Sequence, residues 1–403
     1  MSSIPQSATA KPQAWGAVLA MSLAAFALVA SEFMPVSLLT PIASDLQVTE
    51  GQAGLGISVS GLFALITSLF IAAIAARMNR RPLLMALTIL MITSGSIVAL
   101  ASNYAWFMVG RALIGIAIGG FWSLSAATAM RLVSDEDVPR ALAVVNGGNA
   151  LATVIAAPLG SYLGSLIGWR GAFFCVVPVA ALATAWLWIS LPNMRTEKVR
   201  VSSSPLRLLR DPSIAWGMMA VSIFFMGQFM LFTYLRPFLE TVTQVGPEGL
   251  SMILLSLGIS GLVGTFIIET FIKRAFYGTL IAIPLIMAIL VIALITFGKS
   301  SIIAATLLAL WGLVATAAPV AWWTWLARSL PNDAEAGGGL FVAIVQLAIA
   351  LGATIGGIVF DIHTYRATFE LSALVLILAS VLAYITSRQT VKPDVSSPVE
   401  SNF

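Results

Sequence analysis

Two charged residues lie inside long apolar stretches of the sequence. Glu32 lies nine residues before Pro41, and Arg111 lies eight residues after Asn103. At about 1.5 Å of rise per residue, these spacings place both side chains roughly 12–14 Å below the same side of a helical bundle. A carboxylate at that depth is costly unless it is paired, protonated or facing water. We therefore expect Glu32 and Arg111 to interact, either as a structural pair that locks two helices or as part of a working site.

A carboxyl group in such a place can exchange protons as its surroundings change. Burial disfavours the charged form of a carboxyl group, whereas a nearby cation favours it. Small rearrangements around Glu32 can therefore change its protonation. The chemistry this predicts is a proton switch, in which Glu32 takes up a proton facing one side of a membrane and releases it facing the other, with Arg111 assisting the release.

Aromatic residues near these charges are candidates for binding a flat molecule. Trp122 follows Arg111 by eleven residues, which at about 100° per residue leaves the two within roughly 20° on one helix face. A heterocycle could stack on this indole, although packing or anchoring at a bilayer interface is equally compatible with a tryptophan. Trp322 is a second candidate, because one indole of the neighbouring pair Trp322 and Trp323 could reach a central cavity.

Uncharged polar side chains within the apolar stretches are costly to expose to lipid. They suit hydrogen bonds to a base or to sugar hydroxyls, and they suit contacts between helices equally well. The candidates for substrate binding are Asn146, Asn149, Gln228, Tyr234 and Gln346.

The composition is that of a membrane protein. Of 403 residues, 59% are apolar and 9% are charged, whereas a soluble domain carries about 25% charged residues. One histidine (His363) and one cysteine (Cys175) offer neither a catalytic constellation nor a metal cluster, so we expect no enzyme activity, cofactor or metal. The net charge of +4 does not form a patch for nucleic acid, and we expect a monomer in a lipid bilayer.

Apolar runs long enough to cross a bilayer, about 20 residues each, predict twelve transmembrane helices in an all-α fold. They lie near 16–40, 52–75, 82–101, 104–128, 139–163, 171–191, 213–236, 249–271, 279–297, 301–327, 336–360 and 368–386.

The placement of Lys and Arg tests this count, because they concentrate in cytoplasmic loops. With the N-terminus inside, sixteen fall in cytoplasmic segments and three in outer loops, namely Arg170, Lys299 and Arg366. We therefore expect both termini in the cytoplasm, in a bacterial inner membrane.

Landmarks recur between the two halves of the chain. An offset of 197 residues places Arg131 on Arg328, and Asn149 on Gln346. Parallel repeats of six spans build one large class of secondary transporters, with substrate bound near the midplane between the halves. The predicted division is a tail over 1–12, a six-helix bundle over 13–191, a linker over 192–212, a second bundle over 213–388 and a tail over 389–403.

Several motifs resemble those of the major facilitator superfamily, in its drug/proton antiporter branch. The segment Ser31–Leu39, with Pro41-Ile42-Ala43, resembles the glutamate–phenylalanine–x–proline–x–x–leucine–leucine motif of bacterial exporters. Gly110–Gly115 resembles the intramembrane arginine motif of the family. Ala157–Gly160 resembles its antiporter glycine–proline motif. The sequence is most similar to purine ribonucleoside exporters, through Gly119–Trp122, Ala156–Arg170 and Phe232–Pro237.

The resemblance implies proton-coupled efflux of a small polar metabolite by alternating access, with inosine or guanosine as the expected substrates. Sugars or drugs are the alternatives. It also implies that Arg77, Arg81, Pro158 and Gly160 serve gating or helix packing. The chain departs from the family where Ala72, Ala76 and Asn79 replace a glycine, an aspartate and a glycine, so the usual aspartate gate contact is not expected.

Overall fold

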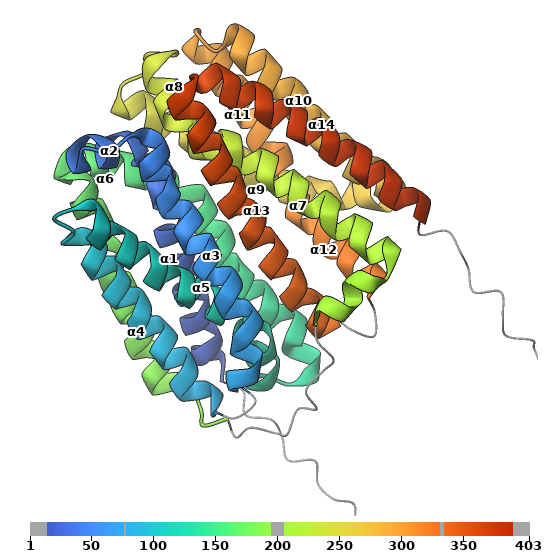
Figure 1. The fold of residues 1–403 in the computed structure, drawn as a ribbon. Helices are drawn as coiled ribbons and strands as arrows, with labels where there is room; N and C mark the ends of the chain where they lie inside the picture. The colour runs from blue at the N-terminus through green and yellow to red at the C-terminus, as the bar shows by residue number, and fades with distance from the viewer. Residues whose placement is uncertain (1–13, 76–77, 195–204, 331–333, 390–403) are drawn as a thin grey trace, which may run out of the picture.

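The computed structural model describes residues 14–75, 78–194, 205–330 and 334–389, which form helices joined by short turns (Figure 1). Arg77, the predicted tail over 1–12 and the tail beyond Gln389 lie outside the described residues. The N-terminal half contains α1 (Trp15–Ser37), α2 (Leu39–Leu46), α3 (Glu50–Ala75), α4 (Arg80–Ala99), α5 (Tyr104–Leu132) and α6 (Val138–Ser190). The C-terminal half contains α7 (Pro212–Thr233), α8 (Leu235–Thr241), α9 (Pro247–Arg274), α10 (Phe276–Phe297), α11 (Ser301–Ala315), α12 (Ala318–Ser329), α13 (Ala334–Ile362) and α14 (Tyr365–Gln389).

Eleven helical segments of the described chain are long and apolar enough to cross a membrane, and one of them, with 53 residues, is long enough for two crossings. This segment is the 53-residue α6, whose helical backbone is interrupted at Gly168 (φ 74°, ψ 165°). Both of its parts pack along α1. Gly148 lies against Ser22, Gly160 against Ser37, and Ser190 returns to Gly16. The chain therefore reverses at Gly168, and the prediction of twelve transmembrane helices is confirmed.

The helices repeat along the chain as the sequence predicts. α1 begins at Trp15 and α7 at Pro212, α3 begins at Glu50 and α9 at Pro247, and α5 begins at Tyr104 and α11 at Ser301, each pair 197 residues apart. The two halves lie side by side (Figure 1). One side of the bundle, here the α2/α8 side, carries α2 and α8. The other, the termini side, carries the start of α1 and the end of α14.

Capping side chains and prolines set many helix ends. Asn103 accepts a hydrogen bond from the Trp106 amide at the start of α5, and Asp211 accepts one from the Ser213 amide at the start of α7. Proline has no amide hydrogen and clashes with the carbonyl four residues earlier. The chain accordingly breaks at Leu38, just before Pro41, and again at the equivalent Tyr234.

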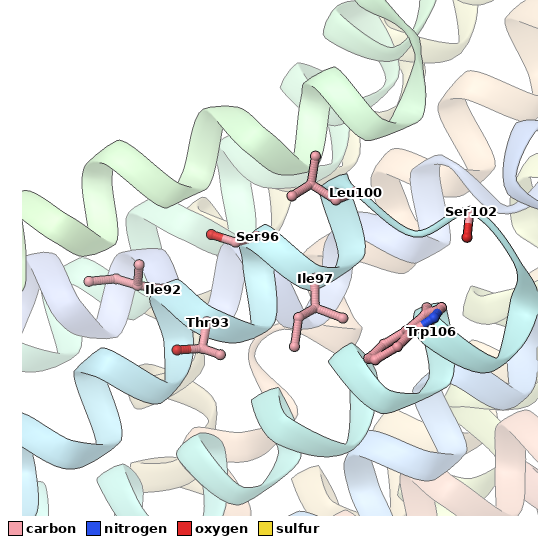
Figure 2. Close-up of a pocket in the computed structure, with 7 residues that line it drawn as sticks. All are labelled: Ile92, Thr93, Ser96, Ile97, Leu100, Ser102 and Trp106. Carbon is pink, nitrogen blue, oxygen red and sulfur yellow. The ribbon is translucent and has the colours of Figure 1, made fainter.

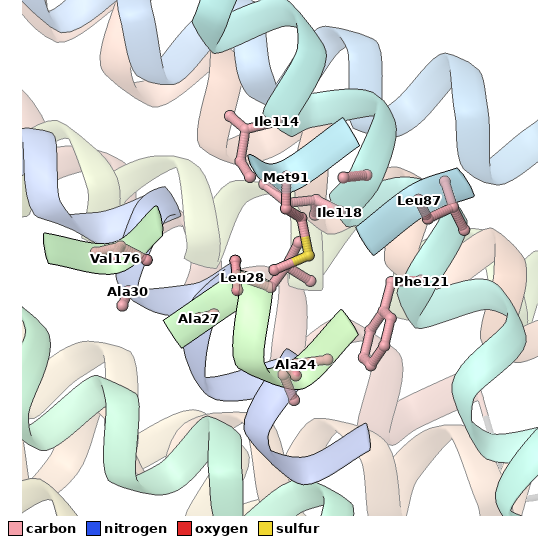
Figure 3. Packing of buried hydrophobic residues seen from close by; sticks show 14 of the residues in the cluster. Ala24, Ala27, Leu28, Ala30, Leu87, Met91, Ile114, Ile118, Phe121 and Val176 are labelled. Carbon is pink, nitrogen blue, oxygen red and sulfur yellow. The ribbon is translucent and has the colours of Figure 1, made fainter. Parts of the chain in front are cut away.

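Each half has its own apolar core. In the N-terminal half, Leu28 of α1 packs among Met91 of α4, Ile118 of α5 and Val176 of α6 (Figure 3). Alanines and glycines on these helices allow their backbones to approach closely, which drives helix association in lipid. These cores allow each half to behave as one body.

The contacts between the halves lie largely on the α2/α8 side. α3 packs along α13, and α6 packs against α9. A Cβ on Gly51 would overlap Asp361 and the Gly357 carbonyl, and a Cβ on Gly258 would come within 2.8 Å of Val154. Toward the termini side, Asn146 is exposed and a Cβ on Gly147 or Gly339 would meet nothing within 4 Å.

Neighbouring glycines in α6 give a matched test of this packing. A Cβ on Gly148 would lie 1.9 Å from the Ser22 carbonyl oxygen, whereas one on Gly147 would be unobstructed. We expect Gly148→Ala to cost about 1–3 kcal/mol by overpacking and to lower the thermal unfolding temperature in detergent. Gly147→Ala should be neutral or stabilising by about 0.5–1 kcal/mol. Equal effects of the two substitutions would contradict the packing of α6 on α1.

Candidate functional site

Arg111 joins three helices through hydrogen bonds to backbone oxygens. Its side chain is 1% exposed. From α5 it donates to the Ser31 carbonyl (2.7 Å) and the Glu32 carbonyl (3.2 Å) of α1. It also donates to the Gly56 carbonyl (3.1 Å) and the Ser60 hydroxyl (3.1 Å) of α3.

A proline explains why one of these carbonyls needs the arginine. Pro35 lies inside α1 and cannot donate to the carbonyl four residues earlier, which belongs to Ser31. An unpaired buried carbonyl is costly, and Arg111 supplies the missing hydrogen bond. The guanidinium is thus fixed by the backbone of α1.

The Glu32 carboxylate is directed elsewhere. Glu32 is 6% exposed, and no ion pair between it and Arg111 is present in the described part of the chain. The expected interaction therefore takes place between the guanidinium and the backbone of Glu32. The carboxylate is left free to respond to its other neighbours.

Gln346 of α13 is the residue that reaches this carboxylate. Its Nε2 atom donates to Oε1 of Glu32 at 3.3 Å, and its own Oε1 atom is buried without a hydrogen-bond partner. Gln346 belongs to the C-terminal half and Glu32 to the N-terminal half. Glu32 is therefore held at the junction of the halves, its backbone by Arg111 of its own half and its carboxylate by Gln346 of the other.

The α2/α8 side is closed above this junction. Asp361, at the end of α13, accepts hydrogen bonds from the Thr49 hydroxyl (2.6 Å) and the Gly51 amide (3.0 Å) at the start of α3. Arg236 donates to the Ser37 carbonyl, which Pro41 leaves without an amide partner, and pairs with Glu240 at 2.7 Å. The contacts of Asp361 with the start of α3 and of Arg236 with Ser37 cross from one half to the other and fasten the α2/α8 side.

The predicted residues of the N-terminal half lie apart from Glu32. Trp122 is half-buried and lies about 16 Å along α5 from Arg111, toward the termini side. Asn146 is exposed and donates to the Leu142 carbonyl within its own helix. Asn149 is half-buried, next to the glycine that packs on Ser22. These three side chains occupy the level of the bundle nearer to the termini side.

The predicted residues of the C-terminal half differ in what their polar atoms do. The Tyr234 hydroxyl donates to the Ala353 carbonyl at 2.7 Å, and its ring stacks on Phe360. Trp322 is 1% exposed between Phe224 and Trp325. In contrast, Oε1 of Gln228 is buried without a partner. Gln228 is therefore available to a ligand, whereas Tyr234 and Trp322 are engaged in packing.

The predicted gating residues occupy packing positions where they are described. Arg81 donates to the Trp188 carbonyl at 2.7 Å, which ties α4 to α6. Pro158 and Gly160 are both buried in α6, and a Cβ on Gly160 would lie 2.7 Å from the Ser37 hydroxyl of α1. The backbone of α6 stays helical at Pro158 and departs from helix geometry at Gly168.

Sequence reasoning missed an aromatic cluster beside the acid. Phe33 of α1 contacts Phe229 and Phe232 of α7, and Phe232 stacks on Trp311 of α11. Phenylalanines in an apolar run give no signal of their own. The position of Phe33 next to Glu32, and of Phe229 next to Gln228, is the signal that could have found them.

A separate hollow lies on the outside of the N-terminal half, between α4 and α5 near the α2/α8 side (Figure 2). It is lined by Ile92, Thr93, Ser96, Ile97, Leu100, Ser102 and Trp106. Its exposed apolar side chains, such as Leu100 at 79% exposure, are those expected against lipid. Among the described residues, no group of His, Cys, Asp and Glu side chains could hold a metal ion.

Two pseudo-symmetrical bundles of six membrane-spanning helices, with a buried acid, cation and amide at their junction, are the architecture of a membrane transporter. Residues 21–338 match the Major Facilitator Superfamily, and the chain belongs to this family of transporters.

Two relatives match almost the whole chain. The chain is 59% identical over 378 residues to the transcription regulatory protein OpdE of Pseudomonas aeruginosa, covering 93% of this chain and 94% of that protein. It is 39% identical over 368 residues to the purine ribonucleoside efflux pump NepI of Escherichia coli (strain K12), covering 91% of this chain and 93% of that protein.

Solved structures show the same fold at low sequence identity. The human organic anion transporter MFSD10 matches with a TM-score of 0.71 and 17% identity, covering 92% of this chain and 100% of that one. A bacterial homologue of the human lysosomal transporter Spinster, in an inward-facing and occupied conformation, matches with a TM-score of 0.74 and 17% identity, covering 94% of this chain and 98% of that one.

The link between Pro35 and Arg111 predicts a specific energetic coupling. Pro35→Ala restores an amide hydrogen for the Ser31 carbonyl, so the loss of Arg111 should cost less in that background. We expect Arg111→Leu to be less destabilising in the Pro35→Ala protein than in the wild type, by about 1 kcal/mol. Thermal unfolding of the wild type, the two single variants and the double variant in one detergent measures this coupling.

Pro178 provides the control, because it lies in the second part of α6 and is exposed. Pro178→Ala should show no coupling with Arg111→Leu. Additive effects of Pro35→Ala and Arg111→Leu would show that the arginine does not replace the missing amide.

Proposed function

We propose that this protein is a proton-coupled efflux antiporter of small polar metabolites, with purine ribonucleosides such as inosine and guanosine as substrates. The name of the relative at 39% identity supports this substrate class. The family supports transport as the activity. The protein works as a monomer in the bacterial inner membrane, with both termini in the cytoplasm, as the distribution of Lys and Arg indicates.

The observation that carries the proposal is the buried carboxylate of Glu32, which accepts a hydrogen bond from Gln346 across the junction of the halves. Protonation of a carboxyl group removes one acceptor oxygen and adds one hydrogen-bond donor. Protonation of Glu32 therefore changes which hydrogen bonds Gln346 and a substrate can make with it. Arg111 stays attached to the backbone of α1, beside Glu32. A proton on Glu32 and a substrate at the same junction therefore compete.

Alternating access follows from the placement of the contacts between the halves. The α2/α8 side is fastened by Asp361 and Arg236, while Asn146 is exposed toward the termini side. We interpret this arrangement as the state open to the cytoplasm. Rocking the halves to face outside separates Gln346 from Glu32 and lets the acid take up a proton from that side.

The substrate class rests on hydrogen-bonding atoms that the protein leaves unused. Oε1 atoms of Gln228 and Gln346 are buried without partners, and each can accept a hydrogen bond from a neutral nucleoside. Sugars and drugs are the alternatives. Among the described residues Glu32 is the buried acid at the junction, and a cationic drug would favour a second acid beside it.

The relative at 59% identity suggests a second candidate, an effect on gene expression, because its name describes a transcription regulatory protein. A transporter can produce such an effect by changing the internal concentration of a small molecule that controls expression. In this account, a variant that does not transport also loses the effect on expression. An effect that persists in Glu32→Gln would favour a regulatory role separate from transport.

Vesicle transport tests the proposed activity. Inside-out vesicles with an imposed proton gradient should accumulate radiolabelled inosine, and an uncoupler should abolish this accumulation. We expect Glu32→Gln to lose at least tenfold of the gradient-driven uptake, because an amide cannot exchange a proton, while retaining exchange of inosine at equal pH. Glu370→Gln, which changes an exposed acid paired with Arg366, is the matched control.

Two outcomes would contradict the proposal in different ways. Gradient-driven uptake that Glu32→Gln leaves intact would remove this residue from the mechanism. Vesicles that ignore inosine but respond to sugars or drugs would keep the transporter and reject the substrate class.

The contact of Asp361 with the start of α3 predicts how the α2/α8 side opens. Asp361→Ala removes the acceptor of two hydrogen bonds, so this side should open more often. We expect Ser58→Cys, in a Cys175→Ser background, to react several-fold faster with an impermeant maleimide added outside when Asp361→Ala is present. Glu370→Ala, at the same side, should have no effect. An unchanged rate with Asp361→Ala would show that this contact does not hold the side closed.

A further inference from the structure

Four aromatic rings meet where α1 of the N-terminal half crosses α7 and α11 of the C-terminal half. Phe33 stacks on Phe229 with ring centres 5.9 Å apart and meets Phe232 edge-on at 6.3 Å. Phe229 meets Phe232 edge-on at 5.9 Å. Phe232 stacks on Trp311 at 6.0 Å with ring planes 11° apart. The rings form one cluster across the junction, held by two stacked and two edge-on contacts.

The halves contribute unequally to this cluster. Phe229, Phe232 and Trp311 belong to the C-terminal half, and Phe33 is the ring that comes from the N-terminal half. Phe229 and Trp311 are 4% and 3% exposed, whereas Phe33 and Phe232 are half-buried. A separation of the halves that carries Phe33 away uncovers the face of Phe229, on which Phe33 stacks.

Polar atoms without hydrogen-bond partners lie on one residue of the aromatic cluster and on a residue next to the cluster. The Trp311 Nε1 atom, a donor, is buried without a hydrogen-bond partner, and so is Oε1 of Gln228, an acceptor. Gln228 precedes Phe232 by four residues, so both project from one face of α7. Phe33 follows Glu32, whose carboxylate Gln346 contacts. Buried polar groups normally find partners, and those that do not are available to a ligand.

We propose that Phe229, with Phe232 edge-on beside it and Trp311 stacked on Phe232, forms the stacking platform for a planar nitrogen heterocycle, and that the Phe33 ring fills this place when the halves are closed over it. The inference rests on the proposed transport function and names the part of the substrate that the C-terminal half binds. Any base can stack on an aromatic side chain, because every base has a π face. The donor of Trp311 and the acceptor of Gln228 suit the edge of a purine.

This platform assigns different parts of the ligand to the two halves. The C-terminal half binds the heterocycle by its face, while Glu32 and Arg111 of the N-terminal half supply the charges. A sugar without a base has no π face and gains nothing from the platform. The platform therefore also separates nucleosides from the sugar alternative.

Binding to the purified protein tests the platform, with inosine, hypoxanthine and ribose as probes. We expect Phe229→Leu to weaken binding of inosine and hypoxanthine by roughly tenfold or more, because leucine has no π face. Phe229→Tyr should keep most of the affinity. Trp311→Phe keeps a ring but loses the donor and should weaken binding of the two purines. Phe266→Leu, which changes a ring of α9 that is 75% exposed, is the matched control.

Thermal unfolding of each variant shows whether it is folded. The Tyr variant at the same position keeps an aromatic ring, so it distinguishes the loss of stacking from a general packing defect. Purine affinity that is equal in the wild type and Phe229→Leu overturns the platform. If such a protein still transports inosine, the proposed function stands without it. Wild-type protein that neither binds nor transports any of the purines overturns both.

Discussion

The hydrogen bonds of the Arg111 guanidinium determine how α1, α3 and α5 fit together. A buried cation in a membrane bundle needs several acceptors, and here they are carbonyls of α1 and α3 and the Ser60 hydroxyl. Pro35 makes one of those carbonyls available by lacking an amide hydrogen. Because the guanidinium is bound to the backbone, its charge stays beside Glu32 whatever the carboxyl group does. This is a fixed cation next to a titratable acid.

The two repeats have kept one fold and diverged in chemistry at the same positions. At 197 residues from Glu32 the second half has Phe229, and at 197 residues from Arg111 it has Leu308, which is 1% exposed. Ser31, whose carbonyl binds the arginine, corresponds to Gln228. Glu32 and Arg111 therefore belong to one half, and Phe229, Phe232 and Trp311 belong to the other. The two groups meet at the junction between the halves.

Much of the fold could be predicted from the sequence, because the constraints of a bilayer are simple. The lengths of the apolar runs predicted the transmembrane helices, and the landmarks that recur after 197 residues predicted the two halves. The count of twelve transmembrane helices also needs the reversal at Gly168, which depends on one residue with positive φ between two apolar runs. The charged residue Arg170, two residues later, indicated in the sequence that a loop lies here.

The site was predicted less completely, because depth along a helix does not say which atoms face each other. Matching depths brought Glu32 and Arg111 together, but the role of Pro35 in presenting a carbonyl required the structure. Trp322 looked equally able to reach a cavity, and its burial between Phe224 and Trp325 depends on packing that no spacing reveals. The pairing of Gln346 with Glu32 likewise arises from how the two halves meet.

The central claim is that substrate and proton compete at Glu32, and proton release on binding tests it most directly. Inosine is added to purified protein in a weakly buffered solution containing a pH indicator. The account predicts that the wild-type protein releases protons as inosine binds and that Glu32→Gln binds inosine without release. Equal release by both proteins, or binding by the wild type with no release at any pH, would contradict it.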